Sequence, residues 1–189
     1  MTRRALDVEA IGRRFAVPGR FQAAVPAGAG HINDTYVATY RDGDQAWRYV
    51  FQRINPAIFR DPAGMMDNIA RVTRHLQERL AREPGADAER ETLTLVPTRD
   101  DANWVVDEEG CAWRAYRFLE GTRALDTVNT PEQAYQAARA FGLFQRRLAD
   151  LPGPRLHETI PDFHHPPRRY QALDSARRRD AHQRARDVQ

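Results

Sequence analysis

The sequence contains no lysine and only one cysteine, and both features restrict its chemistry. All 29 basic side chains are therefore arginine. Any site that depends on a lysine ammonium group is excluded. The one cysteine, Cys111, cannot form a disulfide within the chain, which fits a reducing compartment, and we expect a cytoplasmic protein.

Long hydrophobic runs are also missing. No stretch of about 18 apolar residues is present, so we expect no membrane-spanning segment and no membrane partner. Residues 1–10 lack the apolar core of a secretory signal. Hydrophobic residues make up 41% of the chain and charged residues 29%, which is enough for a packed core in 189 residues.

The positive charge is modest and uneven. The formal net charge is +3, but seven arginines lie between Arg168 and Arg186. Such a tail is typical either of a solvated helix or of a patch that binds nucleic acid or another anionic surface. Because the net charge is low, we do not expect a nucleic-acid partner.

The pattern of β-branched and aromatic residues predicts an antiparallel sheet. Three strands are expected in the first 54 residues, at 21–27, 35–40 and 46–54. The Asp42-Gly43 pair between the second and third favours a hairpin turn. Further strands are predicted at 93–96, 104–106 and 111–119.

Helices are predicted before, between and after these strands. Apolar residues have an approximate helical spacing in 5–16. Asp61-Pro62 is a typical helix start, and apolar residues then recur every three or four positions to about Pro84. Thr130 begins a capping box for a helix that reaches Asp150, and a last helix is expected over 168–185.

This order predicts an α+β fold in two parts. Strands with one inserted helix come first, and only helices follow. We therefore expect a sheet-containing lobe at 1–119, a linker at 120–130 and the start of a helical lobe at 131–189.

A glycine loop, Gly28-Ala29-Gly30, lies between two predicted strands. Rossmann and P-loop sites are excluded because both need a helix directly after the glycines. Protein kinases instead place a glycine loop in a hairpin, where its backbone covers the phosphates of ATP. A plain turn has the same composition, so the loop alone does not decide between them.

The third predicted strand favours the kinase interpretation. Alternation places Val50 and Gln52 on one face, toward an adenine ring and a phosphate respectively. The next helix has the position of the kinase helix αC, so Asn68, or else Asp67, is expected to be the partner of Gln52. Residues 111–119 then lead to Glu120, which is either a hinge residue beside the adenine or a solvated side chain.

With these segments in order, the sequence resembles the phosphotransferase enzyme family, the aminoglycoside phosphotransferase superfamily with its protein-kinase-like fold. Within it, the likeness is greatest to N-acetylhexosamine 1-kinases. Six collinear strings carry the resemblance: GAGHINDTY (28–36), YVFQRIN (49–55), IFRDPAGMMDNI (58–69), WRAYRFLE (113–120), FGLFQ (141–145) and TIPDFHHPPRRY (159–170).

The resemblance implies ATP-dependent phosphorylation of a small sugar at its anomeric hydroxyl. It assigns phosphate binding to Gly28 and Gly30. It assigns the adenine pocket to Val50, Arg117, Phe118 and Leu119. His31, Asn33 and Asp34 would lie at the loop tip, close to phosphate or substrate, although His31 could equally bond its own turn.

The resemblance also shows where this chain departs from ordinary kinases. Their strand lysine and helix glutamate are Gln52 and Asn68 here. The N-acetylhexosamine kinases likewise carry uncharged residues at these positions. Another group or Mg²⁺ must then supply the missing positive charge at the phosphates.

The catalytic motif of the superfamily is absent from these 189 residues. Phosphoryl transfer needs an aspartate for the acceptor hydroxyl and ligands for Mg²⁺, which this superfamily takes from an H-x-D-x-x-x-x-N loop and a later aspartate. None of the six histidines is followed two positions later by aspartate. His164-His165 is expected to be a helix-entry loop, since adjacent residues rarely share one ion. We therefore assign no catalytic or metal-binding residue, and expect the N-terminal half of a kinase that is inactive alone.

Three functional hypotheses remain at this point. A truncated sugar kinase predicts exposed apolar surface on the helix at 131–150, because its packing partners are missing. A non-catalytic nucleotide-binding module, or half of a heteromeric kinase with a partner that supplies the missing lobe, is the alternative. A small nucleic-acid binder would act through the arginine tail.

Overall fold

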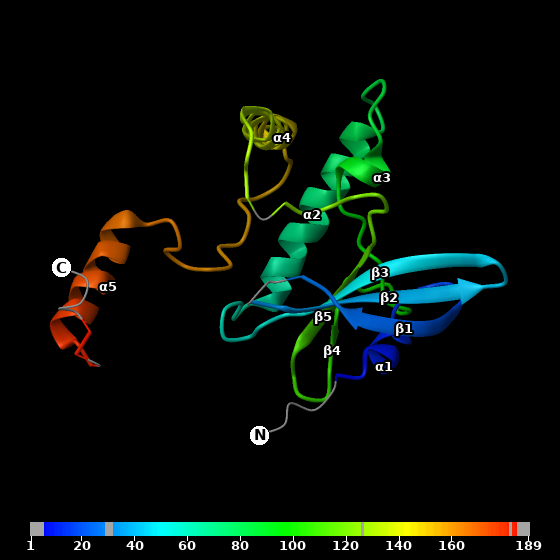
Figure 1. Cartoon of the computed structure of the whole chain (residues 1–189), viewed down its shortest axis with the longest axis horizontal. Coiled ribbons are helices and arrows are strands. Elements are labelled where there is room, and N and C mark those ends of the chain that lie inside the picture. Colours follow the sequence, from blue (N-terminus) through cyan, green and yellow to red (C-terminus); the bar gives the residue numbers. More distant parts are fainter. Residues whose placement is uncertain (1–5, 29–31, 126, 182, 185–189) are drawn as a thin grey trace.

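The computed structural model describes residues 6–28, 32–125, 127–181 and 183–184. One antiparallel sheet with the strand order β1-β2-β3-β5-β4 forms its centre (Figure 1). The strands are β1 (Arg20–Pro26), β2 (Asp34–Asp42), β3 (Gln45–Arg53), β4 (Val105–Val106) and β5 (Ala112–Arg117). The helices are α1 (Val8–Gly12), α2 (Pro62–Leu80), α3 (Ala88–Glu91), α4 (Pro131–Leu148) and α5 (Pro166–Arg179).

The predicted hairpin joins β2 and β3. The two strands pair along their full length, from Asp34 opposite Arg53 to Asp42 opposite Gln45. Gly43 in the turn has a φ of +56°, a conformation that favours glycine. β5 then pairs with β3, although α2, α3, β4 and more than 50 residues of sequence separate them, so that Gln52 lies opposite Arg114.

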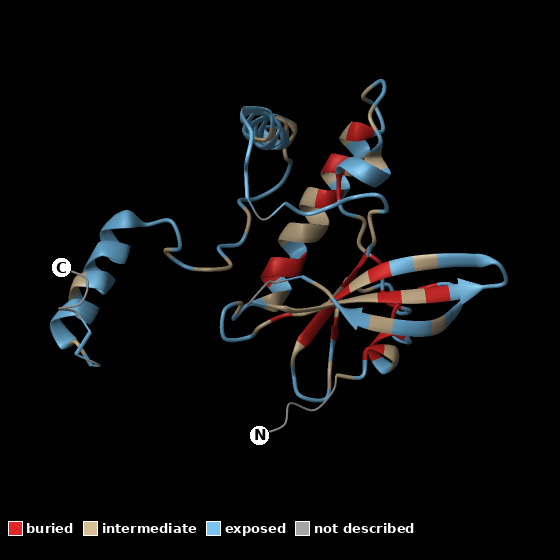
Figure 2. Ribbon diagram, in the orientation of Figure 1, coloured by how far each residue is buried: buried red, intermediate tan, exposed pale blue. Residues whose placement is uncertain are grey.

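Two hydrophobic clusters cover opposite faces of the sheet. The cluster on the side of α1 contains the fully buried Phe15, Phe51 and Trp113. The cluster on the side of α2 contains Ile54, Met65, Met66 and Ala112. Because side chains alternate along a strand, Phe51 faces α1, whereas its neighbours Val50 and Gln52 lie on the face covered by α2. Figure 2 shows the buried residues concentrated in the sheet, α1 and α2.

The helix starts agree with the sequence signals. The Asp61 carboxylate accepts a hydrogen bond from the backbone N–H of Gly64 at 2.9 Å, with Pro62 in the first turn. Thr130 Oγ1 accepts from the N–H of Gln133 at 3.2 Å and caps α4. His165 Nδ1 accepts from the N–H of Arg168 at 3.3 Å and caps α5, in agreement with a helix-entry loop.

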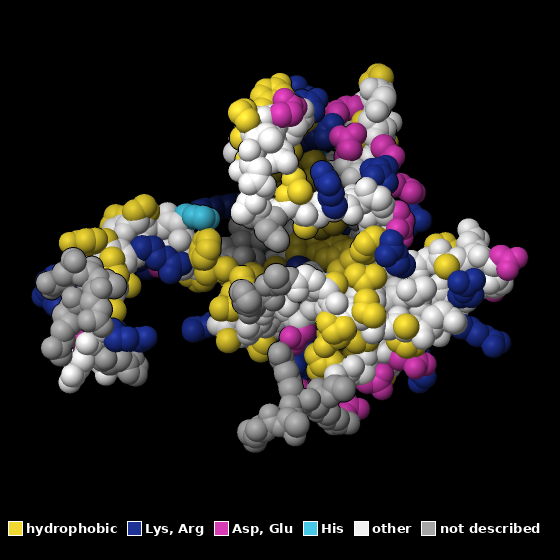
Figure 3. Space-filling model, viewed as in Figure 1, with side chains coloured by type: hydrophobic (Ala, Val, Ile, Leu, Met, Phe, Trp, Pro, Cys, Tyr) yellow, Lys and Arg dark blue, Asp and Glu magenta, His cyan; other side chains and the backbone are white. Residues whose placement is uncertain are grey.

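The two parts of the predicted α+β fold are both present, but they are packed very differently. α2 contains six buried residues, whereas α4 and α5 contain none within the part of the chain described. Tyr135, Phe141 and Phe144 of α4 are 60, 72 and 46% exposed. The predicted apolar surface on this helix is therefore confirmed, and Figure 3 shows hydrophobic side chains at the surface of both α4 and α5.

Several predicted boundaries were wrong. Residues 93–96 form no strand. Leu95 makes only an isolated bridge to Tyr116, although the flanking N–H of Val96 still donates to Ala115 O. The first helix is shorter than 5–16, and α5 ends at Arg179 because Asp180 adopts a left-handed conformation with φ of +37°. Among the described helices, none is long and apolar enough to cross a membrane.

Candidate functional site

The glycine loop joins β1 to β2 at one end of the sheet. The N–H of Ala27 donates to Thr35 O at 2.9 Å, the last rung before the loop. Gly28 is exposed and has a φ of +83°, which favours glycine. The predicted placement of this loop between two strands is confirmed. Two of its predicted binding residues, Gly30 and His31, lie outside the described residues.

Asn33 ties the glycine loop to the chain that leads into α2. Its Oδ1 accepts a hydrogen bond from the N–H of Asn55 at 3.0 Å. Asp34 starts β2 and lines a hollow of about 140 Å³ with Arg53, Asn55 and Cys111 among its other walls. Asn33 therefore has a structural role, and the contact of both residues with substrate stays a prediction.

Gln52 lies in a polar group at the glycine-loop end of the sheet. Its Nε2 donates to Thr35 Oγ1 at 3.1 Å. Its Oε1 accepts two hydrogen bonds from Arg114, from Nε at 3.0 Å and from Nη2 at 2.9 Å. Three neighbouring strands, β2, β3 and β5, thus contribute one side chain each to this polar group.

Val50 and Tyr116 form the apolar part of the same sheet face. They lie opposite one another in the β3–β5 pairing. The pair Phe51–Ala115 separates them from Gln52 and Arg114. Tyr116 is buried, and burial raises the pKa of its hydroxyl, so the ring stays neutral. Val50 is half-buried and agrees with its predicted place on the face toward α2.

The end of β5 is held by a clamp from β3. The Nε of Arg48 donates to Glu120 Oε1 at 2.9 Å, and its Nη2 also pairs with the carboxylate. The guanidinium lies 4.1 Å from the ring centroid of Phe118, whose N–H donates to Arg48 O at 3.0 Å. The hydrogen bond from Arg48 lowers the pKa of Glu120. Glu120 is thus an ion-paired residue at the predicted hinge.

The apolar pair and the polar group lie in line along β3. Arg48 beside the predicted hinge and Gln52 beside the glycine loop are four residues apart, which in a strand is roughly 13 Å. Val50 lies between them. One face of the sheet thus carries apolar side chains next to the predicted hinge and hydrogen-bonding groups next to the loop.

Two predicted adenine-pocket residues have other contacts. Leu119 O accepts from Thr122 Oγ1 at 2.8 Å, so this carbonyl already has a donor. Arg117 lies opposite Tyr49 and hence on the sheet face away from Val50, and its Nη1 pairs with Glu89 at 3.1 Å. The side chain of Arg117 therefore does not line the face that carries Val50.

Comparison with known proteins decides the family. The model of the phosphotransferase enzyme family matches residues 23–189. The chain belongs to this family. A crystal structure of spectinomycin phosphotransferase APH(9)-Ia, in complex with ADP and spectinomycin, is similar to this phosphotransferase-family chain with a TM-score of 0.47 and 14% identity. The match covers 78% of this chain and 37% of that one, so the chain spans little more than a third of that enzyme's length.

In this phosphotransferase-family chain, Asn68 is not the partner of Gln52. Its Nδ2 donates to His157 O at 2.8 Å, and its Oδ1 accepts from the N–H of His157 at 2.8 Å. Both ends of the amide are thus used by a segment that follows α4. The expected kinase-like pair is replaced by Gln52 with Arg114, and nucleotide binding by Asn68 stays a prediction.

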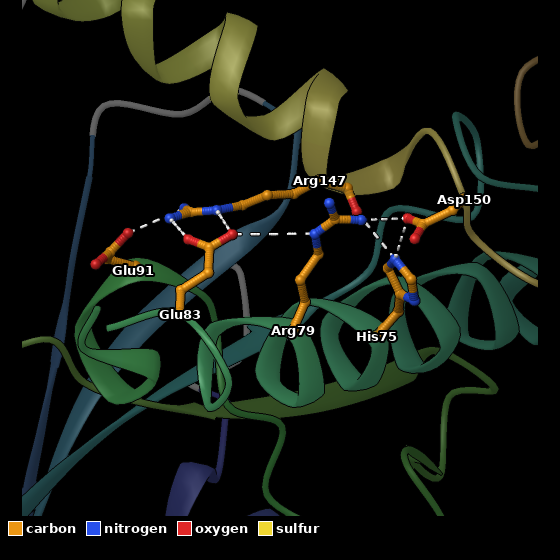
Figure 4. Close-up of polar contacts among 6 residues, drawn as sticks. All are labelled: His75, Arg79, Glu83, Glu91, Arg147 and Asp150. Atoms are coloured by element: carbon orange, nitrogen blue, oxygen red, sulfur yellow. Dashed lines mark hydrogen bonds and ion pairs between the residues drawn. The ribbon is translucent and has the colours of Figure 1, made fainter. Parts of the chain in front are cut away.

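The contact with Asn68 is one end of a longer polar stripe on α2. Arg71 donates to Pro154 O at 2.7 Å, and His75 Nε2 lies 2.9 Å from Arg147 O. At the far end, Arg147 pairs with Glu83 at 2.6 Å and with Glu91 at 2.9 Å. Arg79 also pairs with Asp150. Figure 4 shows this end of the stripe, with the contacts among His75, Arg79, Glu83, Glu91, Arg147 and Asp150. Residues 147–157 thus run antiparallel to α2.

No metal centre is evident in the described part of the chain. No three His, Cys, Asp or Glu side chains among the described residues are grouped so that they could hold a metal ion. A hollow of about 260 Å³ lies on the side of α1, beside Arg14 and Asp107. None of the predicted nucleotide-binding residues lines it.

The sequence analysis did not identify four residues of this site, which are Thr35, Arg48, Arg114 and Tyr116. Alternation within WRAYRFLE places Arg114 and Tyr116 on one face, and this was a usable signal. Their apposition to Gln52 and Val50 depends on β5 pairing with β3, which no local pattern specifies.

Proposed function

We propose that this chain is the nucleotide-binding lobe of an ATP-dependent small-molecule phosphotransferase. The observation that carries the proposal is the arrangement of one sheet face, with Val50 and Tyr116 next to the hinge and Gln52 and Arg114 next to the glycine loop. An adenine ring requires the first kind of surface and phosphates the second. Membership of the phosphotransferase family supports it.

Within this proposal, the predicted roles are kept where the geometry allows them. Val50, Phe118 and the backbone of Leu119 would contact the adenine, while Gly28, Gly30 and Gln52 would lie along the phosphates. His31, Asn33 and Asp34 would lie toward the acceptor. Asn68 would act indirectly, because its amide holds the chain at His157.

We further propose an N-acetylhexosamine as the acceptor, phosphorylated at its anomeric hydroxyl. Support comes from the resemblance of strings such as YVFQRIN and WRAYRFLE to N-acetylhexosamine 1-kinases. We also propose that the 189-residue chain alone does not transfer phosphate. It contains no H-x-D-x-x-x-x-N motif, from which this superfamily takes its catalytic aspartate and a Mg²⁺ ligand.

Half of a heteromeric kinase is the second candidate. The exposed Tyr135, Phe141 and Phe144 on α4 favour it, because an apolar helix face of this kind is usually covered by another element. In this case a separate chain would supply the catalytic loop and the Mg²⁺ ligands.

Thermal unfolding with and without ATP tests the proposal. A ligand that binds only the folded state raises the melting temperature with its concentration. We expect ATP to raise the melting temperature and the sugar alone, at the same concentration, to leave it unchanged. The same protein, incubated with ATP, Mg²⁺ and N-acetylglucosamine or N-acetylgalactosamine, should form no sugar phosphate. Absence of ATP binding would contradict the nucleotide-lobe proposal, and sugar phosphate formation would contradict the inactivity of the chain alone.

A further inference from the structure

The proposed function requires a cation at the nucleotide phosphates, and the usual one is missing. Kinases place a lysine on the third strand for this purpose. Gln52 is the corresponding residue here, and the whole sequence contains no lysine. A neutral amide donates hydrogen bonds but does not balance the charge of a polyphosphate.

Arg114 lies directly beside the position of the missing lysine. It is opposite Gln52 in the β3–β5 pairing, and its Nε and Nη2 both donate to Gln52 Oε1. Gln52 Nε2 donates in turn to Thr35 Oγ1, which fixes the orientation of the amide. The guanidinium is therefore held in one place, at the end of the sheet that carries the glycine loop.

The described surroundings of Arg114 supply no counter-charge. Its other contacts are Met65 Sδ, 4.0 Å from Nη1, and the Tyr116 ring, whose centroid is 5.2 Å from Cζ. None of the ion pairs among the described residues includes it. Burial lowers the pKa of Arg114 below its ordinary value, and the weaker influence of Tyr116 acts in the opposite direction. A charge withdrawn from water without a partner is costly.

Other arginines with largely buried side chains differ from Arg114 in this respect. Arg53, with a side chain 14% exposed, pairs with Asp107 at 2.9 Å. Arg147, with a side chain 12% exposed, pairs with Glu83 and Glu91. Within the described residues, the fold thus neutralises these arginines with carboxylates but leaves Arg114 to a neutral amide, a sulfur and a ring.

We propose that Arg114 binds the phosphates of the nucleotide in place of the missing lysine, and that Gln52 is its positioning residue. This inference rests on the proposed nucleotide-lobe function. Two N–H groups of the guanidinium bond Gln52, and those on Nη1 have only the long contact with sulfur. A guanidinium donates in a planar fork that matches phosphate oxygens, so the Nε–Nη2 edge bonds the amide while the remaining donors bind the anion.

Calorimetric titration of the 189-residue chain with ATP, inorganic tripolyphosphate and adenosine tests this. Arg114→Met keeps the side-chain length but removes the charge. We expect it to weaken the binding of ATP and tripolyphosphate about tenfold or more, while adenosine affinity changes less than about twofold. Arg41→Met is the matched control, because Arg41 is exposed and lies at the opposite end of β2. Its affinities should equal those of the unmodified chain.

A second substitution separates a binding role from a structural one. The double variant Arg114→Met/Gln52→Lys places a cation on β3, where ordinary kinases have their lysine. Its ATP affinity should recover to within about threefold of that of the unmodified chain. Unchanged ATP affinity in Arg114→Met would overturn this inference but not the proposed function. Equal losses for ATP and adenosine would also overturn it, since they indicate a general disturbance. Absence of ATP binding by the unmodified chain would overturn both this inference and the proposed function.

If Arg114→Met does not fold, the unmodified chain still provides the test. The NMR signal of the Arg114 Nε–Hε group, assigned by its loss in Arg114→Lys, should shift with ATP and with tripolyphosphate but not with adenosine. A signal that none of the three ligands moves, or that adenosine moves equally, would contradict direct phosphate binding.

Discussion

The sheet region and the helices that follow it differ in how they use apolar side chains. In the sheet region, Phe15, Phe51 and Trp113 are at most 1% exposed, and both sheet faces carry a cluster of buried side chains. In α4, Phe141 is 72% exposed, although its helix has the same three- and four-residue apolar spacing as α2. A periodic apolar stripe therefore marks a face that can be covered, and the tertiary partners decide whether it is.

α4 and the segment that follows it are attached to the rest of the chain mainly by polar contacts. α4 is joined to α2 through Arg147 with Glu83 and Glu91, and the chain beyond it through Asn68 and His157. Hydrogen bonds and partly exposed ion pairs each contribute little net stability, whereas buried apolar area contributes much. The sheet region should consequently determine the global stability of the chain, and α4 should open more easily.

Matched phenylalanine substitutions should reveal the largest contrast. Phe51→Ala removes a ring packed 5.5 Å from that of Phe15 and should lower the free energy of unfolding by about 3–5 kcal/mol. Phe141→Ala removes an exposed ring and should change it by less than about 0.5 kcal/mol. Urea unfolding measures both. Comparable losses for the two variants would show that the face of α4 is covered in solution.

Two helix glycines should respond with opposite signs. A Cβ at Gly12 would lie 1.9 Å from the hydroxyl of Tyr40, so Gly12→Ala should destabilise the chain by about 1–3 kcal/mol. A Cβ at Gly142 in α4 meets nothing within 4 Å, and Gly142→Ala should stabilise by up to about 1 kcal/mol. Both follow from urea unfolding, and destabilisation by Gly142→Ala would again indicate a covered α4.

A smaller, local effect is expected at the contact between α2 and the chain after α4. Asn68→Ala removes both hydrogen bonds to the His157 backbone and should cost about 1–2 kcal/mol of local stability. Hydrogen exchange should become faster around residue 157. Arg74→Ala, an exposed residue on the same helix, is the control and should leave it unchanged. Neither variant should change exchange in the sheet. Unchanged exchange around residue 157 in Asn68→Ala would contradict the prediction.

The smallest predicted effect is a dependence on acid. The hydrogen bond from Arg147 lowers the pKa of Glu83 in the folded chain. The contribution of this pair is then complete above the ordinary glutamate pKa of about 4.3 and is lost as the pH falls through the lower folded value. Protection from exchange at the end of α4, relative to the intrinsic rate at each pH, should fall in that range, and Glu83→Gln should reduce this fall. A loss of protection that begins above pH 6 would indicate another group.

Local signals explain how much of this structure was predictable. The Asp42-Gly43 turn, the Asp61 and Thr130 caps and the common face of Val50 and Gln52 follow from short-range chemistry, and all were correctly placed. The pairing of Gln52 with Arg114 was not predicted, because it depends on β5 lying next to β3. Asn68 was assigned the wrong partner for a related reason, since the rotation of α2 about its axis and the path of residues 147–157 are set by tertiary contacts.

Hydrogen exchange of the 189-residue chain with and without ATP tests the central claim most directly. The nucleotide-lobe account predicts that ATP slows exchange in β1, in the glycine loop and at residues 118–120. It predicts no change of exchange in α5. Slower exchange confined to α5 would show that ATP binds the arginine-rich helix as a simple polyanion. That result, or no change anywhere at saturating ATP, would contradict the account.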